Sequence, residues 1–146
     1  MKRFEFSLEK MLDYKNQLLR DEKQRLAELR QKLDQLTQTL HALREEYARC
    51  NRELNAETQK GILPQDILLR KSYLNLLNDR IKFQMQQVRL AEIRVKEQVA
   101  AVVKVSQDIS TLDKLKERQY EEYLVEENRE LQVLIEEFVT NTRMSS

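Results

Sequence analysis

The stretch KGILPQD, residues 60–66, contains the only glycine and the only proline of this 146-residue chain. Gly61 suits the position just beyond a helix C-terminus, where the left-handed backbone conformation costs glycine little. Pro64 suits the first turn of a following helix and disfavours helix at the residue before it. Asp66 would lie in that first turn, where its charge complements the helix dipole. The stretch therefore predicts a turn near residues 60–65 between two helices.

Outside this turn, the composition favours continuous helix. Leu, Glu, Gln, Lys, Arg and Ala dominate, and their low cost per residue adds up over long windows. The scarcity of glycine and proline leaves no turn chemistry for a sheet or a loop-rich fold. The chain is 40% hydrophobic, and regularly spaced apolar residues can be buried, which argues against disorder. We therefore predict an all-α fold.

Apolar residues recur every seven positions on both sides of the turn, which is the pattern of a coiled coil. The first series is Leu12, Leu19, Leu26, Leu33, Leu40, Tyr47 and Leu54. The second series is Ile67, Leu74, Ile81, Val88, Val95, Val102 and Ile109. Three residues after each member of the second series, the residues are mixed: Arg70, Leu77, Gln84, Ala91, Gln98, Val105 and Leu112. These small and polar positions allow close approach of the helices but weaken the predicted seam.

Two long helices joined by so short a loop must run antiparallel. The prediction is one coiled-coil hairpin domain over residues 1–146, with frayed ends at 1–3 and about 140–146. Because the turn precedes the chain midpoint, the second helix is longer, and residue 4 should lie opposite about residue 122. About 20 residues then remain as an unpaired helix that is both apolar and acidic, with eight Glu and two Arg between 117 and 137.

The chain has no residue pattern typical of an enzyme. His41 is the only histidine and Cys50 the only cysteine, whereas a metal site needs several convergent ligands. His41 fits a surface position near the seam, and Cys50 fits a small buried one. Phosphate-binding and hydrolase motifs are absent from the sequence. We predict a protein that is not an enzyme, without cofactor or metal.

The balance of charge argues against nucleic-acid partners, and the lack of a long apolar stretch argues against membrane insertion. The chain has 26 Lys and Arg against 25 Asp and Glu, without the basic excess of a polyanion-binding protein. Six basic residues and two Glu lie between 80 and 104, but they are distributed along a helix. No stretch is apolar enough for a membrane span, and the N-terminus lacks the pattern of a secretion signal. These features predict a cytosolic protein.

Just after the turn, the sequence contains more apolar residues than a single coiled-coil seam requires. Leu69, Tyr73, Leu76 and Leu77 lie within nine positions of one another. Two interpretations stay open at this point: a patch that docks a partner, or a broad core stripe.

Three stretches resemble the FliJ family, the small coiled-coil component of the flagellar type III export apparatus. The start, RFEFSLEKMLDYKNQ, is similar to the family opening in Phe4, Phe6, Leu8 and Leu12. The turn, LNAETQKGILPQDI, resembles the family's hairpin turn. The end, LDKLKERQYEEYLVEENRELQVLIEEF, resembles the family tail in Leu115, Arg118, Gln119, Glu127, Asn128, Arg129, Glu137 and Phe138. The resemblance covers essentially the whole chain.

This resemblance implies an antiparallel hairpin similar to the rotor stalk of F- and V-type ATPases. The end with both termini would enter the hexameric flagellar export ATPase and promote its assembly and activity. The half nearer the turn would contact the cytoplasmic domain of the large export-gate membrane protein, and export chaperones would be escorted. The protein would then be cytoplasmic, peripherally associated with the inner membrane at the flagellar base.

Carried onto this sequence, the resemblance implies two sets of contact residues. Gate-docking positions would be Leu43, Tyr73 and Leu77. ATPase-ring contacts would be Phe4, Phe6, Leu8, Arg118, Gln119, Glu127, Arg129 and Phe138.

The alternative is a generic structural or adaptor coiled-coil dimer. Gln84 and Gln98 in the seam, together with the unpaired tail, would fit a larger helical bundle. A stalk is expected as a monomer, whereas an adaptor is expected as a stable dimer.

Overall fold

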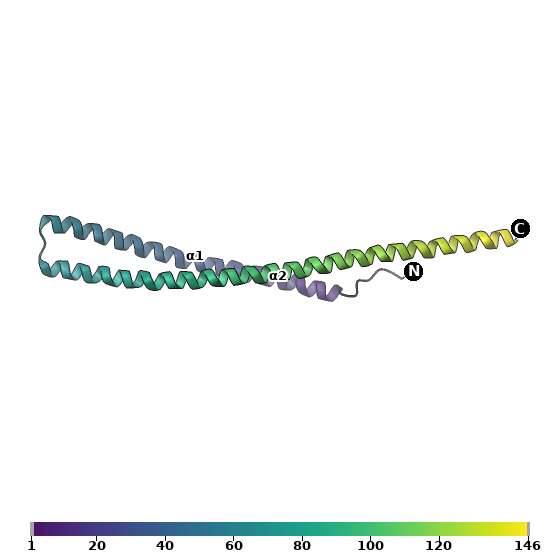
Figure 1. Ribbon diagram of the computed structural model, residues 1–146, viewed down its shortest axis with the longest axis horizontal. Helices are drawn as coiled ribbons and strands as arrows, with labels where there is room; N and C mark the ends of the chain where they lie inside the picture. Colours follow the sequence, from purple (N-terminus) through teal and green to yellow (C-terminus); the bar gives the residue numbers. More distant parts are fainter. Residues whose placement is uncertain (1, 146) are drawn as a thin grey trace. The chain divides into compact units, whose positions relative to one another are not determined.

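The computed structural model describes residues 2–145, with only the backbone of Ser145. It contains two long helices, α1 (Glu9–Lys60, 52 residues) and α2 (Pro64–Ser145, 82 residues), and no strand within the described residues (Figure 1). The predicted all-α fold, with the second helix longer than the first, is confirmed. Contacts divide the chain into two units, Met1–Asp21 with Val102–Ser146, and Glu22–Ala101.

The turn forms as its residue types dictate. Gly61 has a φ of 86°, the left-handed conformation that favours glycine, and its N–H donates to the Thr58 carbonyl at 3.2 Å. Pro64 is the first residue of α2. The Leu63 carbonyl accepts hydrogen bonds from the N–H groups of Asp66 and Ile67 at 3.0 and 3.2 Å, as expected at a helix start.

In the unit Glu22–Ala101, segments of α1 and α2 run antiparallel and bury a seam between them. Hydrogen bonds join Gln84 to Leu36 and Gln98 to Glu22. The two pairs are separated by the same two heptads on each helix, with α1 numbers falling as α2 numbers rise. The buried apolar side chains of this unit are Leu40, Leu54, Leu74, Leu77 and Ala91.

Gln84 and Gln98 are part of this seam. Their side chains are 9% and 8% exposed. Gln84 Nε2 donates to the Leu36 carbonyl at 3.0 Å, and Gln98 Nε2 donates to the Glu22 carbonyl at 2.9 Å and also to Glu22 Oε2. A buried amide is costly only when it lacks hydrogen bonds. Both glutamines bond within the two-helix packing, so neither needs a second chain to satisfy it.

In the unit formed by Met1–Asp21 with Val102–Ser146, the helices also run antiparallel. Leu12 and Val105 are buried. Two ion pairs cross between the helices, Lys15 with Asp108 at 3.0 Å and Glu9 with Lys116 at 2.9 Å. Residues 2–6 precede α1 without helical structure.

Two predictions about the domain stay predictions. Both α1 and α2 contribute residues to both units, and this division does not test whether residues 1–146 act as one domain. Fraying at 1–3 and about 140–146 is likewise untested. α2 remains helical through Ser145, and the terminal positions 1 and 146 lie outside the described residues.

Candidate functional site

The residues expected at the export gate differ in accessibility. Tyr73 is 41% exposed, Leu43 is half-buried, and Leu77 is 2% exposed. Leu77 is therefore enclosed by the seam of its own unit, and its side chain is not available to a partner in this conformation. Of the three expected positions, Tyr73 offers the largest accessible surface.

A polar cluster holds Tyr73 in place. We call Glu46, Arg49, Cys50 and Tyr73 the tyrosine cluster. The Tyr73 hydroxyl from α2 donates to Glu46 Oε1 on α1 at 3.3 Å, and Cys50 Sγ donates to the same oxygen at 3.3 Å. Arg49 pairs with Glu46 at 2.5 Å and with Glu53 at 2.9 Å. These contacts fix the phenol ring against the helix pair.

The protonation states of the tyrosine cluster agree with this geometry. Hydrogen bonding to Arg49 holds the pKa of Glu46 below its ordinary value. Burial and then the negative charge of Glu46 raise the pKa of Tyr73, so its hydroxyl stays protonated and donates. Burial is also the first cause of the raised pKa of the Cys50 thiol. A thiol with a raised pKa is a poor nucleophile, so the cluster is suited to positioning rather than reaction.

Beside the tyrosine cluster, the surface is apolar and slightly hollowed. A cavity of about 220 Å³ is lined by Cys50, Glu53, Leu69, Arg70 and Tyr73. Leu69 is 70% exposed, and Leu76 one heptad later is 45% exposed. The dense apolar stretch therefore divides: Leu77 belongs to the core, and Leu69, Tyr73 and Leu76 contribute to the surface.

This apolar surface continues along α2 beyond the residues that sequence reasoning singled out. We define the outer stripe as Leu69, Leu76, Phe83 and Leu90. Phe83 is 61% exposed and Leu90 is 49% exposed. The sequence analysis did not single out these two residues, because it considered only the seven-residue series predicted to be buried. The seven-residue spacing from Leu69 was the signal that could have found them.

Several residues expected at the ATPase ring gather near the N-terminus, where an aromatic group ties residues 2–6 to α2. We call Phe4, Tyr120 and Tyr123 the aromatic clamp. The Phe4 ring centre lies 5.1 Å from that of Tyr120 and 5.4 Å from that of Tyr123, near the position predicted from the turn. The Tyr123 hydroxyl donates to the Lys2 carbonyl at 2.8 Å. The Phe4 ring therefore packs against residues of its own chain.

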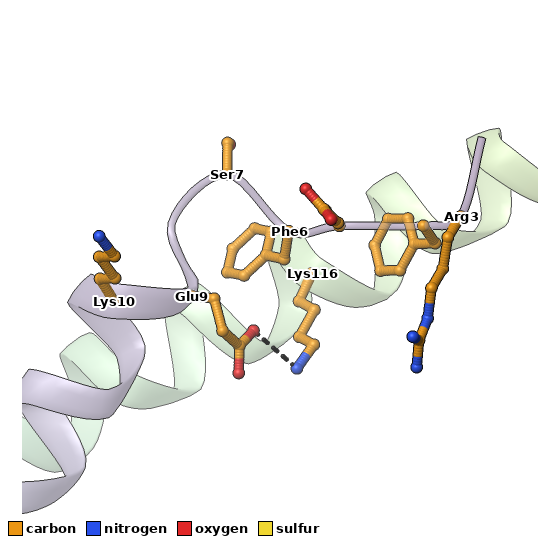
Figure 2. A pocket seen from close by; sticks show the side chains of 8 residues that line it. Arg3, Phe6, Ser7, Glu9, Lys10 and Lys116 are labelled. Atoms are coloured by element: carbon orange, nitrogen blue, oxygen red, sulfur yellow. Dashed lines mark ion pairs between the residues drawn. The ribbon is translucent and has the colours of Figure 1, made fainter.

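Figure 2 shows the N-terminal segment passing over α2, with Glu9 and Lys116 pointing toward each other. Phe6 is 6% exposed. An open cavity of about 880 Å³ lies along this segment, and its lining residues are Arg3, Phe4, Glu5, Phe6, Ser7, Glu9, Lys10 and Lys116. Phe6 is therefore a core residue of its unit, whereas Leu8, two residues later, is 38% exposed.

The remaining ring candidates lie farther along α2. Arg118 is exposed and Gln119 is half-buried, whereas Glu127 and Arg129 are both exposed. Arg129 pairs with Glu126 on its own helix at 3.6 Å. Phe138 is 71% exposed.

We call residues 124–144 the C-terminal segment. Every residue of this segment is exposed. Its large apolar side chains are Leu124, Val125, Leu131, Val133, Leu134, Ile135, Phe138, Val139 and Met144. The structure thus agrees with the expectation of a helix end that buries no side chain against the rest of its unit. An apolar face this extensive is typical of an interaction site.

The described residues form no cluster that could hold a metal ion. Within residues 2–145, no three His, Cys, Asp or Glu side chains gather so that they could hold a metal ion. His41 is exposed and lies 3.0 Å from Glu45, and Cys50 is a free thiol. In the same part of the chain, neither helix contains a stretch apolar enough to cross a bilayer.

Comparison with known proteins identifies a family. A family model described as "Flagellar FliJ protein" matches residues 4–143. Comparison with curated proteins found no match. Comparison with solved structures found none either.

Proposed function

Since the chain belongs to the FliJ family of flagellar proteins, we propose that it acts in flagellar protein export as a non-enzymatic, stalk-like coiled coil. Family membership makes it a component of the export apparatus. The proposal adds that it binds and stimulates the hexameric export ATPase and links it to the export gate. The observation that carries the proposal is the C-terminal segment, an extended helical surface on which every side chain is exposed.

The ATPase contact is assigned to the C-terminal segment together with Leu8 and Arg118. The segment offers apolar side chains at heptad spacing, such as Leu131 and Phe138, with exposures of 55% and 71%. A helix of this kind buries its apolar stripe in a groove between other helices. Phe4 and Phe6 support this surface from within the unit, since they pack against the chain itself.

Stimulation of the purified export ATPase tests this assignment. A chain that ends at residue 123 keeps the aromatic clamp and loses the exposed helix. A full-length chain with Leu131→Ser, Leu134→Ser and Phe138→Ser keeps the length and loses the apolar surface. Both variants should lose affinity for the ATPase by about 30-fold, the effect of removing about 2 kcal/mol of hot-spot contacts.

The matched control is Leu63→Ser in the turn, where the side chain is 66% exposed and outside the proposed surface. This variant should stimulate the ATPase as the unaltered chain does. Undiminished stimulation by the chain ending at residue 123 would show that the C-terminal segment is not the ATPase contact.

The gate contact is assigned to Tyr73, Leu43 and the apolar surface around Leu69. The tyrosine cluster fixes the Tyr73 ring, so little conformational freedom is lost on docking. Leu77 supports this surface from below, because it is buried between the helices.

Binding to the isolated cytoplasmic domain of the gate protein tests this second contact. Tyr73→Ala should weaken binding by about tenfold, as removal of a docking aromatic does, and Leu43→Ala should weaken it less. Tyr14→Ala is the control, because Tyr14 is 61% exposed and belongs to the other unit. Equal affinity of Tyr73→Ala and Tyr14→Ala for the domain would remove Tyr73 from the site.

Two further parts of the proposal concern partners and location. The protein would escort export chaperones and would work in the cytoplasm at the base of the flagellum. Co-purification of tagged protein with flagellar chaperones, from cells separated into cytoplasmic and membrane fractions, measures both. Recovery of chaperones with an unrelated coiled coil at the same yield would contradict the escort role.

A further inference from the structure

The outer stripe and the C-terminal segment match each other in spacing. On α2, Leu76, Phe83 and Leu90 are exposed and follow one another at intervals of seven residues, with exposures of 45%, 61% and 49%. In the C-terminal segment, Leu124, Leu131 and Phe138 repeat the same interval, with exposures of 40%, 55% and 71%. Three positions of each helix thus share the same repeat, and helical stripes of equal repeat can pack as a coiled coil.

The two stripes are opposite in charge. Residues 76–90 contain three Lys or Arg and one Asp, whereas residues 124–138 contain five Glu and one Arg. Among the described residues, none of the three basic side chains in 76–90 takes part in an ion pair within the chain. Opposite charges around two apolar surfaces favour their association, and like charges disfavour pairing of either surface with itself.

Charges also lie beside the apolar residues on both helices. Arg80 lies three residues before Phe83, and Glu127 lies four residues before Leu131. Arg89 directly precedes Leu90, and Glu137 directly precedes Phe138. When Phe83 faces Leu131, these charges flank the two ends of the contact.

From these matches we infer that the C-terminal segment of one molecule, when no ATPase covers it, docks on the outer stripe of a second copy of this chain. The occupant of the basic apolar stripe is thus the acidic apolar helix that the chain itself carries. Leu131 is the middle residue of Leu124, Leu131 and Phe138, and Phe83 is the middle residue of the three outer-stripe positions Leu76, Phe83 and Leu90. The two face each other whether the docked helices run parallel or antiparallel.

Sedimentation of the full chain alone tests the self-contact. Over a concentration series that reaches about 100 μM, the average mass should rise above that of one chain. Raising the salt to about 0.5 M should weaken association by about tenfold, because exposed charge pairs are screened. A single-chain mass throughout the series, at low and at high salt, would overturn the inference.

Charge reversal identifies the two surfaces. A stripe variant carries Arg80→Glu and Arg89→Glu, and a tail variant carries Glu127→Lys and Glu137→Lys. Each variant alone should associate about tenfold more weakly than the unaltered chain. An equimolar mixture of the two should regain association, because the basic tail then meets an acidic stripe. Failure of the mixture to regain it would overturn the pairing.

The matched control reverses Arg25 and Arg30 on α1, whose side chains are exposed and outside the outer stripe. Arg25→Glu with Arg30→Glu makes the same change in net charge as the stripe variant and should leave association unchanged. An equal loss with this control would mean that net charge alone governs association.

Disulfide trapping tests the contact without charge changes. In a Cys50→Ser background, one chain carries Phe83→Cys and a differently tagged chain carries Leu131→Cys. Mild oxidation should join the two chains, and a Leu63→Cys chain in place of the Phe83→Cys chain should join far less. Equal yields would contradict the contact. These experiments contain no ATPase or gate protein, so their failure leaves the proposed function standing.

Discussion

Single residues decide how the helices end and how closely they pack. Gly61 adopts a φ of 86° that other residues rarely take, and Pro64 starts α2 without needing a backbone donor. Within the seam, Gln84 and Gln98 reach across to backbone carbonyls of α1. Carbonyls inside a helix already accept one bond from the residue four positions on, so each glutamine adds a second bond to a satisfied acceptor.

Replacement of Gly61 should act through the backbone alone. A Cβ at this position would meet nothing within 4 Å, so Gly61→Ala leaves packing intact and strains the left-handed conformation. We expect a loss of about 1–2 kcal/mol in the free energy of unfolding, measured by urea titration. Gly61→Asn should lose less, because asparagine tolerates this conformation. An equal loss for the two variants would speak against backbone strain.

Replacement of Gln98 should separate its volume from its hydrogen bonds. Gln98→Leu fills a similar space and leaves the Glu22 carbonyl bonded within its helix, so the unfolding free energy should stay within about 1 kcal/mol of the original or rise. Gln98→Ala opens a cavity in the seam and should cost about 2 kcal/mol. A large loss with Gln98→Leu, measured in the same titration, would mean that the amide itself is required.

At the scale of elements, the N-terminal segment is joined to α2 by aromatic packing and by charge. The aromatic clamp holds Phe4, and ion pairs from Glu9 and Lys15 follow at the start of α1. Asp108 accepts hydrogen bonds from Lys15 at 3.0 Å and from Lys104 at 3.2 Å. Lys15, and then Lys104, keep the pKa of Asp108 below its ordinary value of 3.8.

The lowered pKa of Asp108 predicts a loss of stability in acid. Because the unfolded chain takes up this proton more readily, the stabilisation is present above pH 3.8. It is lost as the pH falls through that value toward the lower folded pKa. Thermal unfolding should be followed from about pH 7 to pH 2. The difference in unfolding temperature between the unaltered chain and Asp108→Asn should become smaller as the pH falls.

The control for the acid experiment is Asp113→Asn on the same helix. Asp113 is exposed and makes no ion pair with any described residue. Asp113→Asn should therefore shift the unfolding temperature only a little, because it removes no ion pair such as that of Asp108 with Lys15. A gap for Asp108→Asn that stays constant down to the lowest pH would contradict the role of its ionised form.

At the scale of the whole molecule, burial is unevenly distributed along α2. Buried residues recur at Leu77, Gln84, Ala91, Gln98 and Val105. Beyond residue 123, no described side chain is buried. Helical structure without buried contacts opens easily, because packing rather than propensity supplies most helical stability. One helix therefore combines a stable stretch with a stretch that is available for binding.

Hydrogen exchange should report this uneven distribution. Backbone amides of the C-terminal segment should exchange at least about 100-fold faster than those between Leu77 and Val105, since local opening there disrupts no core. Mass spectrometry of peptic fragments measures both regions in one experiment. Addition of the export ATPase should slow exchange in the C-terminal segment. Equal protection of the two regions in the free protein would contradict the assignment.

Sequence reasoning predicted the elements well and the surfaces only in part. It predicted the turn, the two helices and the proximity of Phe4 to the region around residue 122, because these follow from local chemistry and from counting along a hairpin. It predicted that Gln84 and Gln98 allow close approach of the helices but weaken the seam. The structure shows both side chains buried and bonded, and the predicted weakening stays a prediction. The family resemblance implied Leu77 as a docking residue, and the structure shows that this side chain is 2% exposed.

The sequence alone determined where the turn lies and that the two helices pair, because helix propensity, Gly61, Pro64 and the seven-residue repeats are local properties. Only the tertiary structure decided which apolar residues face inward. That choice depends on the rotation of each helix about its own axis, and contacts between residues distant in sequence fix it. The same contacts enclose Leu77 and Phe6 and leave Phe83 and Phe138 at the surface.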